Sequence, residues 1–247
     1  MSSSSTLFDR NGVLVEQDAS GVYTIVLDRF ENRFNPRLTR DLSDALSLVE
    51  NGVHPKALVI TGKGKFFSNG LDIDWMTKYV SETQKMIEDV WGVLARILVL
   101  DCRTVAAING HAFGAGLFLA LACDFRIMRT KRGFVNFPEV NLGMKLAKGF
   151  AELAKAKCSK KTLREGVLTA KRYTSGEAVT AGLIDIECPL DKLEETARSV
   201  ASAGFPESLK LANFNPKSFS KIKIELYTDA YRALTMGKAS SLSHSRL

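Results

Sequence analysis

The Gly-rich segment at residues 104–143 constrains the fold of this 247-residue chain more than any other part. It begins with TVAAI, an apolar run of strand length that stops at Asn109-Gly110. Three glycines then lead into LFLALA, which predicts a buried helix because it has no polar face. Backbone N–H groups at such a helix start are unpaired, so they suit an oxygen that carries or develops negative charge. With Glu139 on the following loop, the segment holds the parts needed for proton transfer next to a carbonyl.

Strand and helix patterns alternate on both sides of this segment. Two β-branched runs at 12–18 and 22–28 predict a hairpin, and residues 57–61 predict a buried strand. Apolar residues recur at helical spacing over 36–51 and 81–100. Residues 62–72 are predicted as a second loop punctuated by glycine. After the segment we expect helices at 149–157, 161–170 and 175–181 and a short strand at 183–188. This alternation predicts an α/β or α+β core.

The last part of the chain lacks strand patterns. From residue 190 onward the sequence predicts helices at 190–204 and 206–214, followed by a helical segment at 217–236. Such a region is typical of a helical appendage or an oligomerisation element. We therefore divide the chain into a core at residues 1–190 and a C-terminal helical region at 191–247.

Composition narrows the class of protein. With 45% hydrophobic and 25% charged residues, the chain resembles an ordinary globular protein, and its length fits one sizeable domain. No apolar run reaches the roughly eighteen residues of a membrane span, and the N-terminus lacks the pattern of a secretory signal. The four cysteines are widely spaced and the three histidines never pair. We therefore expect no metal site, no disulfide framework and a reducing compartment.

The net charge of +7 is compatible with several anionic partners. The basic residues are scattered, with short clusters at 129–132 and 159–161, and no nucleic-acid-binding motif accompanies them. We therefore expect no nucleic-acid partner, since an RNA-binding role would rest on charge alone. An anionic small ligand fits better, and a solvated surface is the simplest explanation of any one cluster.

Four segments together resemble the crotonase (enoyl-CoA hydratase/isomerase) superfamily. They are KFFSNGLDI, TVAAINGHAFGAG with LACDFRIM after it, FPEVNLG, and LTAKRYTSGEAVTAGLID. They occur in the family's order, and the resemblance covers roughly residues 12–190. It implies an α/β fold built as a spiral of ββα units, with C-terminal helices that pack in a homotrimer or hexamer. It also implies an acyl-CoA thioester substrate and no separate cofactor or metal, because CoA is part of the substrate.

The resemblance also implies the chemistry. The family's oxyanion hole consists of two backbone N–H groups, which fall here on Leu71 and Ala115. Hydratases of the family carry two glutamates, and the matching positions hold Phe118 and Glu139. One carboxylate beside an apolar wall suits a proton shuttle from C2 to C4 of a 3-enoyl thioester, the Δ3,Δ2-enoyl-CoA isomerase reaction of fatty-acid β-oxidation. Burial near Phe118 and Phe137 should raise the pKa of Glu139 towards the working pH. The alternatives are an enoyl-CoA hydratase, another crotonase reaction, or a non-catalytic acyl-CoA-binding homologue.

Substrate contacts are implied beside these positions. They fall on Asn69, Gly70, Asp72 and Ile73 around Leu71, on Arg33 and Phe34 in the loop after the hairpin, and on Phe118. Some of these residues have simpler interpretations, since Asp72 can cap the next helix and a loop arginine is often solvated. Asp124 and His111 are also more simply explained as structural groups.

The last three residues, Ser245, Arg246 and Leu247, resemble the SKL-type peroxisomal address. A tripeptide of this kind arises by chance on the order of once in a few hundred chains. Combined with the resemblance to acyl-CoA enzymes, it predicts binding to the peroxisomal import receptor. The expected location is the peroxisome or a related organelle of the glycosome type.

Overall fold

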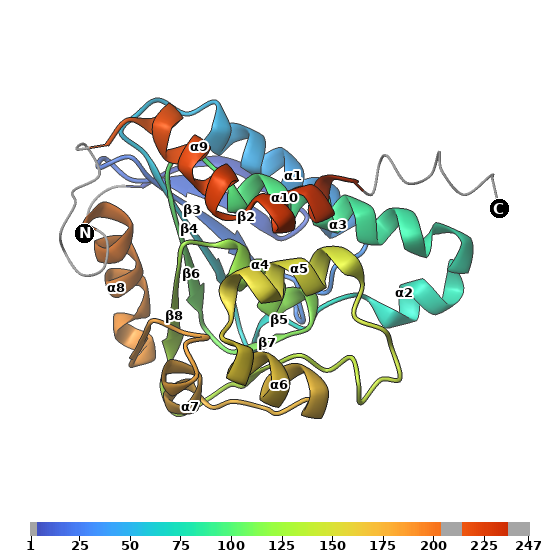
Figure 1. The fold of residues 1–247 in the computed structure, drawn as a ribbon. Coiled ribbons are helices and arrows are strands. Elements are labelled where there is room, and N and C mark those ends of the chain that lie inside the picture. The colour runs from blue at the N-terminus through green and yellow to red at the C-terminus, as the bar shows by residue number, and fades with distance from the viewer. Residues whose placement is uncertain (1–3, 204–213, 237–247) are drawn as a thin grey trace.

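A seven-stranded sheet runs through the centre of the molecule (Figure 1). In this computed structural model, which describes residues 4–203 and 214–236, neighbouring strands are antiparallel from β1 to β3 and parallel from β3 onward. The predicted hairpin (β2 and β3), the buried strand (β4) and the α/β core are confirmed, whereas β1 was not predicted. The spatial order is β1 (Ser5–Arg10), β2 (Val13–Gln17), β3 (Val22–Leu27), β4 (Ala57–Gly62), β6 (Arg103–Ile108), β8 (Phe125–Arg129) and β10 (Ile186–Cys188).

A three-stranded small sheet is a second layer that the sequence patterns did not predict. β5 (Phe66–Ser68), β7 (His111–Phe113) and β9 (Val135–Asn136) pair in parallel in that order. The expectation of a plain loop at 62–72, and of a simple turn between the central strand and its helix, was therefore wrong. Strands of two or three residues are too short to show an alternating apolar pattern.

Helices cover the two faces of the large sheet differently. On one face, α8 (Leu190–Ala203) packs against Val59, Val105 and other strand residues. On the opposite face, α1 (Pro36–Glu50), α3 (Thr83–Leu98) and α4 (Ala115–Ala122) form the main core, and Figure 1 shows α8 across the sheet from α1 and α3. Every residue of α4 is buried, so the predicted apolar helix is confirmed.

The predicted helices before the central segment form with small shifts at their ends. α1 follows the N-cap residue Asn35 and buries the predicted apolar stripe. α3 starts at Thr83 and ends at Leu98, inside the predicted limits of 81–100, because the 3-10 turn η1 (Val80–Glu82) precedes it. A short helix, α2 (Ile73–Lys78), follows the glycine-containing loop.

The three helical segments predicted after the central segment are confirmed as α5 (Lys148–Lys157), α6 (Lys160–Thr169) and α7 (Ser175–Thr180). The N-cap of α7 is Thr174, whose hydroxyl accepts from the N–H of Glu177 while the Glu177 carboxylate accepts from the Thr174 N–H. The strand predicted at 183–188 is shorter, because Leu183 and Ile184 still bond back to Ala178 at the end of α7 and only β10 pairs with the sheet.

The C-terminal region contains two helices after α8 in the part that the structure describes. The single helical segment predicted at 217–236 is divided into α9 (Pro216–Leu226) and α10 (Thr228–Thr235). The division occurs at Tyr227, whose φ of −117° and ψ of 29° leave the helical region. Most of the predicted helix at 206–214, and the C-terminal tripeptide, lie outside the described residues.

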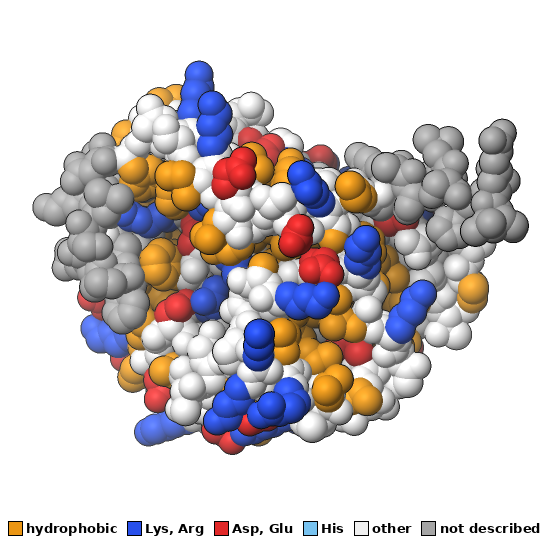
Figure 2. All heavy atoms as spheres, in the orientation of Figure 1, with side chains coloured by type: hydrophobic (Ala, Val, Ile, Leu, Met, Phe, Trp, Pro, Cys, Tyr) orange, Lys and Arg blue, Asp and Glu red, His pale blue; other side chains and the backbone are white. Residues whose placement is uncertain are grey.

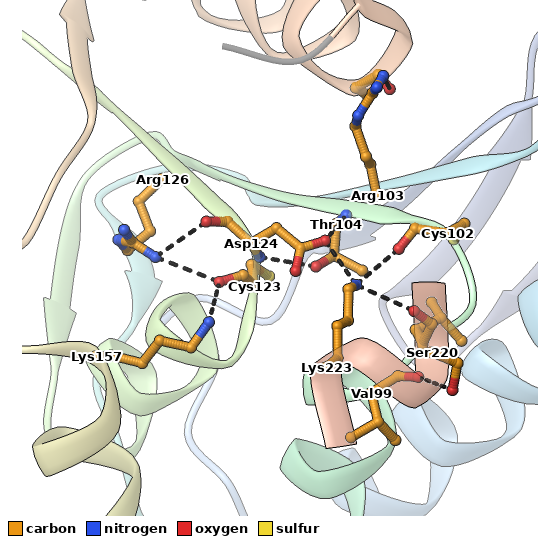
Figure 3. A network of polar contacts seen from close by, with 12 residues as sticks. Val99, Cys102, Arg103, Thr104, Cys123, Asp124, Arg126, Lys157, Ser220 and Lys223 are labelled. Carbon is orange, nitrogen blue, oxygen red and sulfur yellow. Dashed lines mark hydrogen bonds and ion pairs between the residues drawn. The ribbon is translucent and has the colours of Figure 1, made fainter. Parts of the chain in front are cut away.

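A buried lysine attaches α9 to the core (Figure 3). The Nζ of Lys223 donates to the Asp124 carboxylate at 2.7 Å and to the carbonyl oxygens of Leu100 and Cys102 at 3.0 and 2.9 Å. Asp124 also accepts from the backbone N–H of Thr104 at 2.9 Å. Asp124 therefore has the structural role that the sequence predicted.

Basic side chains are distributed among acidic and apolar ones on the face shown in Figure 2, with the densest group at its lower edge. Figure 1 shows α6 (Lys160–Thr169) at the same edge. Within residues 4–203 and 214–236, no helix has the length and apolar character needed to cross a membrane.

Candidate active site

Two glycine-containing turns meet where β5 and β7 end. Gly70 has a φ of +81°, and a Cβ atom added to it would lie 2.8 Å from the carbonyl oxygen of Phe113 and 3.4 Å from the amide nitrogen of Ala115. Glycine suits both this backbone conformation and this close approach. The fold therefore brings Leu71 and Ala115, the two predicted oxyanion donors, to neighbouring positions.

The backbone N–H groups of Leu71 and Ala115 are available to a ligand. Leu71 forms a parallel bridge with Phe34, in which the N–H of Phe34 donates to Gly70 at 2.7 Å and the N–H of Asp72 donates to Phe34 at 2.9 Å. In such a bridge the N–H of Leu71 points away from Phe34. Ala115 is the first residue of α4, where an N–H has no partner inside the helix. Neither N–H has a hydrogen-bond acceptor among the described residues.

The carboxylate of Glu139 faces the same turn. Its Oε1 lies 3.8 Å from the position of a Cβ atom added to Gly114, the residue before Ala115. Its Oε2 is buried and has no hydrogen-bond partner in the described part of the chain. Burial raises the pKa of Glu139 above the ordinary glutamate value, in the direction that the sequence predicted. An unpaired carboxyl oxygen beside backbone donors is suited to proton transfer next to a developing oxyanion.

Aromatic rings form an apolar wall around Phe137, two residues before Glu139 in the chain. Phe118 is fully buried, stacks on Phe150 with ring centroids 4.5 Å apart, and lies 5.4 Å from Phe137. Trp91 of α3 contacts Phe150 edge-on at 5.9 Å. Because Phe137 lies two residues before Glu139, the stack fixes the start of the loop that carries the carboxylate. Position 118 therefore carries a buried ring and no second acid.

Two of the predicted contact residues hold the turn around Leu71. The Asp72 carboxylate caps α2 by accepting from the N–H of Trp75 at 3.2 Å, and it also accepts from the side chain of Asn35 at 2.9 Å. The side chain of Asn69 donates to Glu31 at 3.2 Å. The capping interpretation of Asp72 is therefore confirmed, and both side chains fix the backbone beside the candidate donor.

The other predicted contact residues differ in their accessibility. Arg33 forms ion pairs with two carboxylates, one of which is Asp74 at 2.7 Å. Ile73 is 39% exposed at the start of α2, whereas the side chains of Phe34 and Phe118 are fully buried. Contact between a substrate and any of these side chains stays a prediction.

Two residues that the sequence motifs did not single out hold this loop in place. The hydroxyl of Ser68 accepts from the N–H of Gly70 at 3.2 Å and donates to the carbonyl of Asn32 at 2.7 Å. Asn32, with a φ of +50°, is fully buried, and its side-chain amide donates to the carbonyls of Leu27 at 3.1 Å and Phe66 at 3.2 Å. The available signal was a loop asparagine, which tolerates positive φ better than most residues.

A groove of about 900 Å³ is lined by residues of α1, α3 and α10. Leu71, Ala115 and Glu139 do not line it, although Trp75 of α2 does. Within residues 4–203 and 214–236, no group of three or more His, Cys, Asp or Glu side chains is placed to hold a metal ion.

The sequence matches known proteins over most of its length. A family model described as enoyl-CoA hydratase/isomerase matches residues 17–238. Enoyl-CoA delta isomerase 3 of Arabidopsis thaliana is 32% identical over 224 residues, which cover 87% of this chain and 92% of that protein. Enoyl-CoA delta isomerase 2 of the same plant, named as peroxisomal, is 34% identical over 210 residues, covering 81% of this chain and 85% of that protein. A probable enoyl-CoA hydratase of Mycobacterium bovis is 27% identical over 191 residues, covering 77% and 74% of the two chains.

Solved structures share the fold. The apo structure of a Mycobacterium tuberculosis enoyl-CoA isomerase has a TM-score of 0.83 at 24% identity and covers 95% of this chain and 99% of that chain. An enoyl-CoA hydratase/isomerase family protein from Pseudomonas syringae has a TM-score of 0.84 at 23% identity, with 96% and 99% covered. These identities support the fold alone, whereas the family match extends over most of the sequence. The chain therefore belongs to the enoyl-CoA hydratase/isomerase family of enzymes, the crotonase superfamily.

Proposed function

We propose that this protein is a Δ3,Δ2-enoyl-CoA isomerase, which moves the double bond of a fatty enoyl-CoA from C3 to C2. One observation carries the proposal. The Glu139 carboxylate lies beside the turn of Ala115, and its Oε2 is buried with no partner among the described residues. Two relatives named as delta isomerases add support. The family match makes an acyl-CoA thioester the substrate class.

Glu139 acts as the only acid and base in this mechanism. Its ionised form takes a proton from C2 of the 3-enoyl thioester, and the electrons of the broken C–H bond spread into a dienolate. The N–H groups of Leu71 and Ala115 donate to the thioester oxygen, which carries the negative charge, and each contributes about 3 kcal/mol. Protonated Glu139 then gives the proton to C4, and the remaining double bond lies between C2 and C3. A raised pKa helps a group that must both accept and donate.

Phe118 favours this reaction over hydration. By the family resemblance, a hydratase would carry a second glutamate at this position to share the proton transfers of water addition. A phenyl ring cannot transfer a proton, and Phe118 is fully buried and stacked on Phe150. Hydratase activity is the second candidate, because the relative from Mycobacterium bovis carries that name.

The residues around Leu71 have supporting roles in this proposal. Asn69, Gly70 and Asp72 shape the turn that presents the Leu71 N–H, and Ile73 offers exposed apolar surface beside it. Arg33 binds a phosphate of CoA by exchanging its contact with Asp74. That exchange costs little because the Asp74 side chain is 86% exposed. Phe34 and Phe118 contribute buried side chains to the core that holds the site.

An assay with trans-3-hexenoyl-CoA tests the proposal. We expect the wild-type protein to form the conjugated 2-enoyl product, and in D2O the product should keep part of the original C2 hydrogen at C4 because one carboxylate transfers it. Water addition to 2-hexenoyl-CoA, measured in parallel, would favour the hydratase. Tight binding of acyl-CoA without either reaction would favour a non-catalytic homologue.

We also propose that the protein is imported into peroxisomes or a related organelle. The C-terminal residues 245–247 lie outside the described residues, and support comes from their resemblance to the SKL-type signal and from a relative named as peroxisomal. Deleting these three residues should leave a tagged protein in the cytosol, and unchanged import would exclude the signal. Assembly into a homotrimer or hexamer is likewise a proposal, which light scattering measures.

A further inference from the structure

The outer face of the small sheet carries a cluster of aromatic rings. His111 and Phe113 project from the same face of β7, because residues two apart in a strand share a face, and Ala112 between them is buried. From the ring of His111, the ring centroids of Phe113, Phe66 and Phe134 lie at 5.0, 5.3 and 5.8 Å. His111 is therefore the half-buried centre of this cluster.

Three cations from separate segments surround the rings. Lys65 precedes β5, and its Nζ lies 5.3 Å from the ring centroid of Phe66. Arg172 precedes α7, and its guanidinium carbon lies 5.8 Å from the ring centroid of Phe113. Arg132 lies in the loop between β8 and β9, and all three side chains are exposed. None of the three has a carboxylate partner in the part of the chain that the structure describes.

Two acidic groups near these segments pair with other lysines. Asp28 forms an ion pair with Lys63 at 3.2 Å, and Glu177 forms one with Lys171 at 3.4 Å. Glu177 is also fixed by the capping box of α7. The positive charge of the cluster is therefore not neutralised by these neighbouring carboxylates.

The hydrogen bonding of His111 adds a further donor. The backbone N–H of Phe134 donates to its Nδ1 at 3.2 Å, so the neutral ring carries its proton on Nε2. No acceptor for this Nε2–H is present in residues 4–203 and 214–236. Burial lowers the pKa of His111, and the charges of Lys65, Arg172 and Arg132 lower it further. The polar side chains at this face are therefore donors that lack an acceptor.

We propose that this basic face, formed by Lys65, His111, Arg132 and Arg172, binds a phosphate-bearing ligand. A phosphate dianion offers several acceptor oxygens, and arginine binds two of them at once. Lys65 and His111 lie at the starts of β5 and β7, and Arg172 lies over the ring of Phe113 at the end of β7. Phosphate binding at this face is measured without turnover, so the proposal does not rest on the proposed isomerase activity.

An NMR titration of the histidine rings tests this site. The chain has three histidines, so the His111 signal is identified by its loss in His111→Gln. Saturating inorganic phosphate should raise the pKa of His111 by about one unit relative to sodium chloride of equal ionic strength, the size expected for a nearby opposite charge. His54, which pairs with Asp101 at 2.9 Å, is the internal control and should not move.

Matched variants identify the binding residues. The double variant Arg132→Gln, Arg172→Gln should lose the phosphate-dependent rise, the corresponding double lysine variant should keep part of it, and Lys160→Gln on α6 should behave as wild type. An unchanged His54 signal shows that each variant is folded. No rise in the wild type, or an equal rise in the double glutamine variant, would overturn the proposal.

Coenzyme A and inorganic phosphate are two sources of the same ligand chemistry. A larger shift with coenzyme A at equal concentration would assign the site to a nucleotide-borne phosphate, and equal shifts would assign it to free phosphate. Because the titration needs no turnover, its failure and the failure of the isomerase assay are distinguishable.

Discussion

Asp124 and Glu139 lie in the same Gly-rich segment at residues 104–143, yet the surroundings of their carboxylates are opposite. Asp124 is 13% exposed and accepts from the Nζ of Lys223 at 2.7 Å and from the N–H of Thr104 at 2.9 Å. The Oε2 of Glu139 is buried without a partner among the described residues. The first carboxylate fastens a C-terminal helix to the core, and the second is left with the capacity to transfer a proton.

This difference shows how one segment serves both stability and chemistry. A buried charge that is paired and hydrogen-bonded is costly to disturb. A buried carboxylate without a partner destabilises the folded state, but it is available to a substrate. The two surroundings come from different elements, since α9 supplies the cation for Asp124, whereas Glu139 faces the turn at Gly114 before α4.

The largest effect on stability is expected when Asp124 loses its partner. Lys223→Met removes the cation and leaves the carboxylate and two backbone carbonyls without their donor. We expect the free energy of unfolding, measured with urea, to fall by about 3–5 kcal/mol. Lys221→Met, at an exposed position of the same helix, should stay within about 0.5 kcal/mol of wild type. Equal stability of the two variants would show that the ion pair does not hold α9.

The next largest effect is expected on activity, when a substitution at Gly70 widens the turn beside Glu139. Gly70→Ala places a Cβ atom 2.8 Å from the carbonyl of Phe113 and separates the N–H groups of Leu71 and Ala115. We expect kcat for isomerisation to fall about 100-fold, as when an oxyanion donor is lost.

Gly64→Ala is a matched control for Gly70→Ala, because Gly64 also has a positive φ but its added Cβ would meet no atom within 4 Å. The two substitutions share the backbone strain, and only one touches the site. If both variants lose the same activity, the close approach of the two turns is not needed for the reaction.

The apolar wall around Phe137 should give a moderate effect. Phe118→Leu removes the stack on Phe150 and should lower the free energy of unfolding by about 1–2 kcal/mol. Water then reaches Glu139, so the acid limb of the pH–rate profile should move to lower pH, towards the ordinary glutamate value. Phe30→Leu, at a ring that is 89% exposed, is the control and should change neither measurement. If the acid limb of the Phe118→Leu variant does not move, the aromatic rings do not raise the pKa of Glu139.

The smallest effect is expected in the pH dependence of stability. Burial raises the pKa of Glu139 in the folded state, so the folded protein binds a proton more tightly than the unfolded chain. The free energy of unfolding therefore falls as pH rises from the unfolded value near 4.5 through the folded pKa. Glu139→Gln lacks this loss and should be the more stable protein at neutral pH. The free energy of unfolding of both proteins is measured at a series of pH values. If it changes with pH equally in the two proteins, Glu139 does not have a raised pKa in the folded state.

The local parts of the molecule were predictable from the sequence. The apolar helix α4 and the stripes of α1 and α3 followed from periodicity, because these signals lie within a few residues. The pairing of Leu71 with Ala115 beside Glu139 was implied by the family resemblance alone. The capping role of Asp72 was equally local.

The parts that depend on distant contacts were not predictable. Asp124 and Lys223 are 99 residues apart, and no periodicity links them. The strands of the small sheet pair with one another although each has three residues or fewer. The break between α9 and α10 occurs at Tyr227, where the sequence pattern predicted a continuous helix. The unpaired state of the Glu139 oxygen likewise depends on packing from several elements.

The most direct test of the central claim combines one rate with one stability measurement on Glu139→Gln. We predict that isomerisation of trans-3-hexenoyl-CoA falls by about 10²–10⁴-fold while the free energy of unfolding at neutral pH is equal to or above that of wild type. A folded variant that keeps the wild-type rate would contradict the role of Glu139 as the proton carrier.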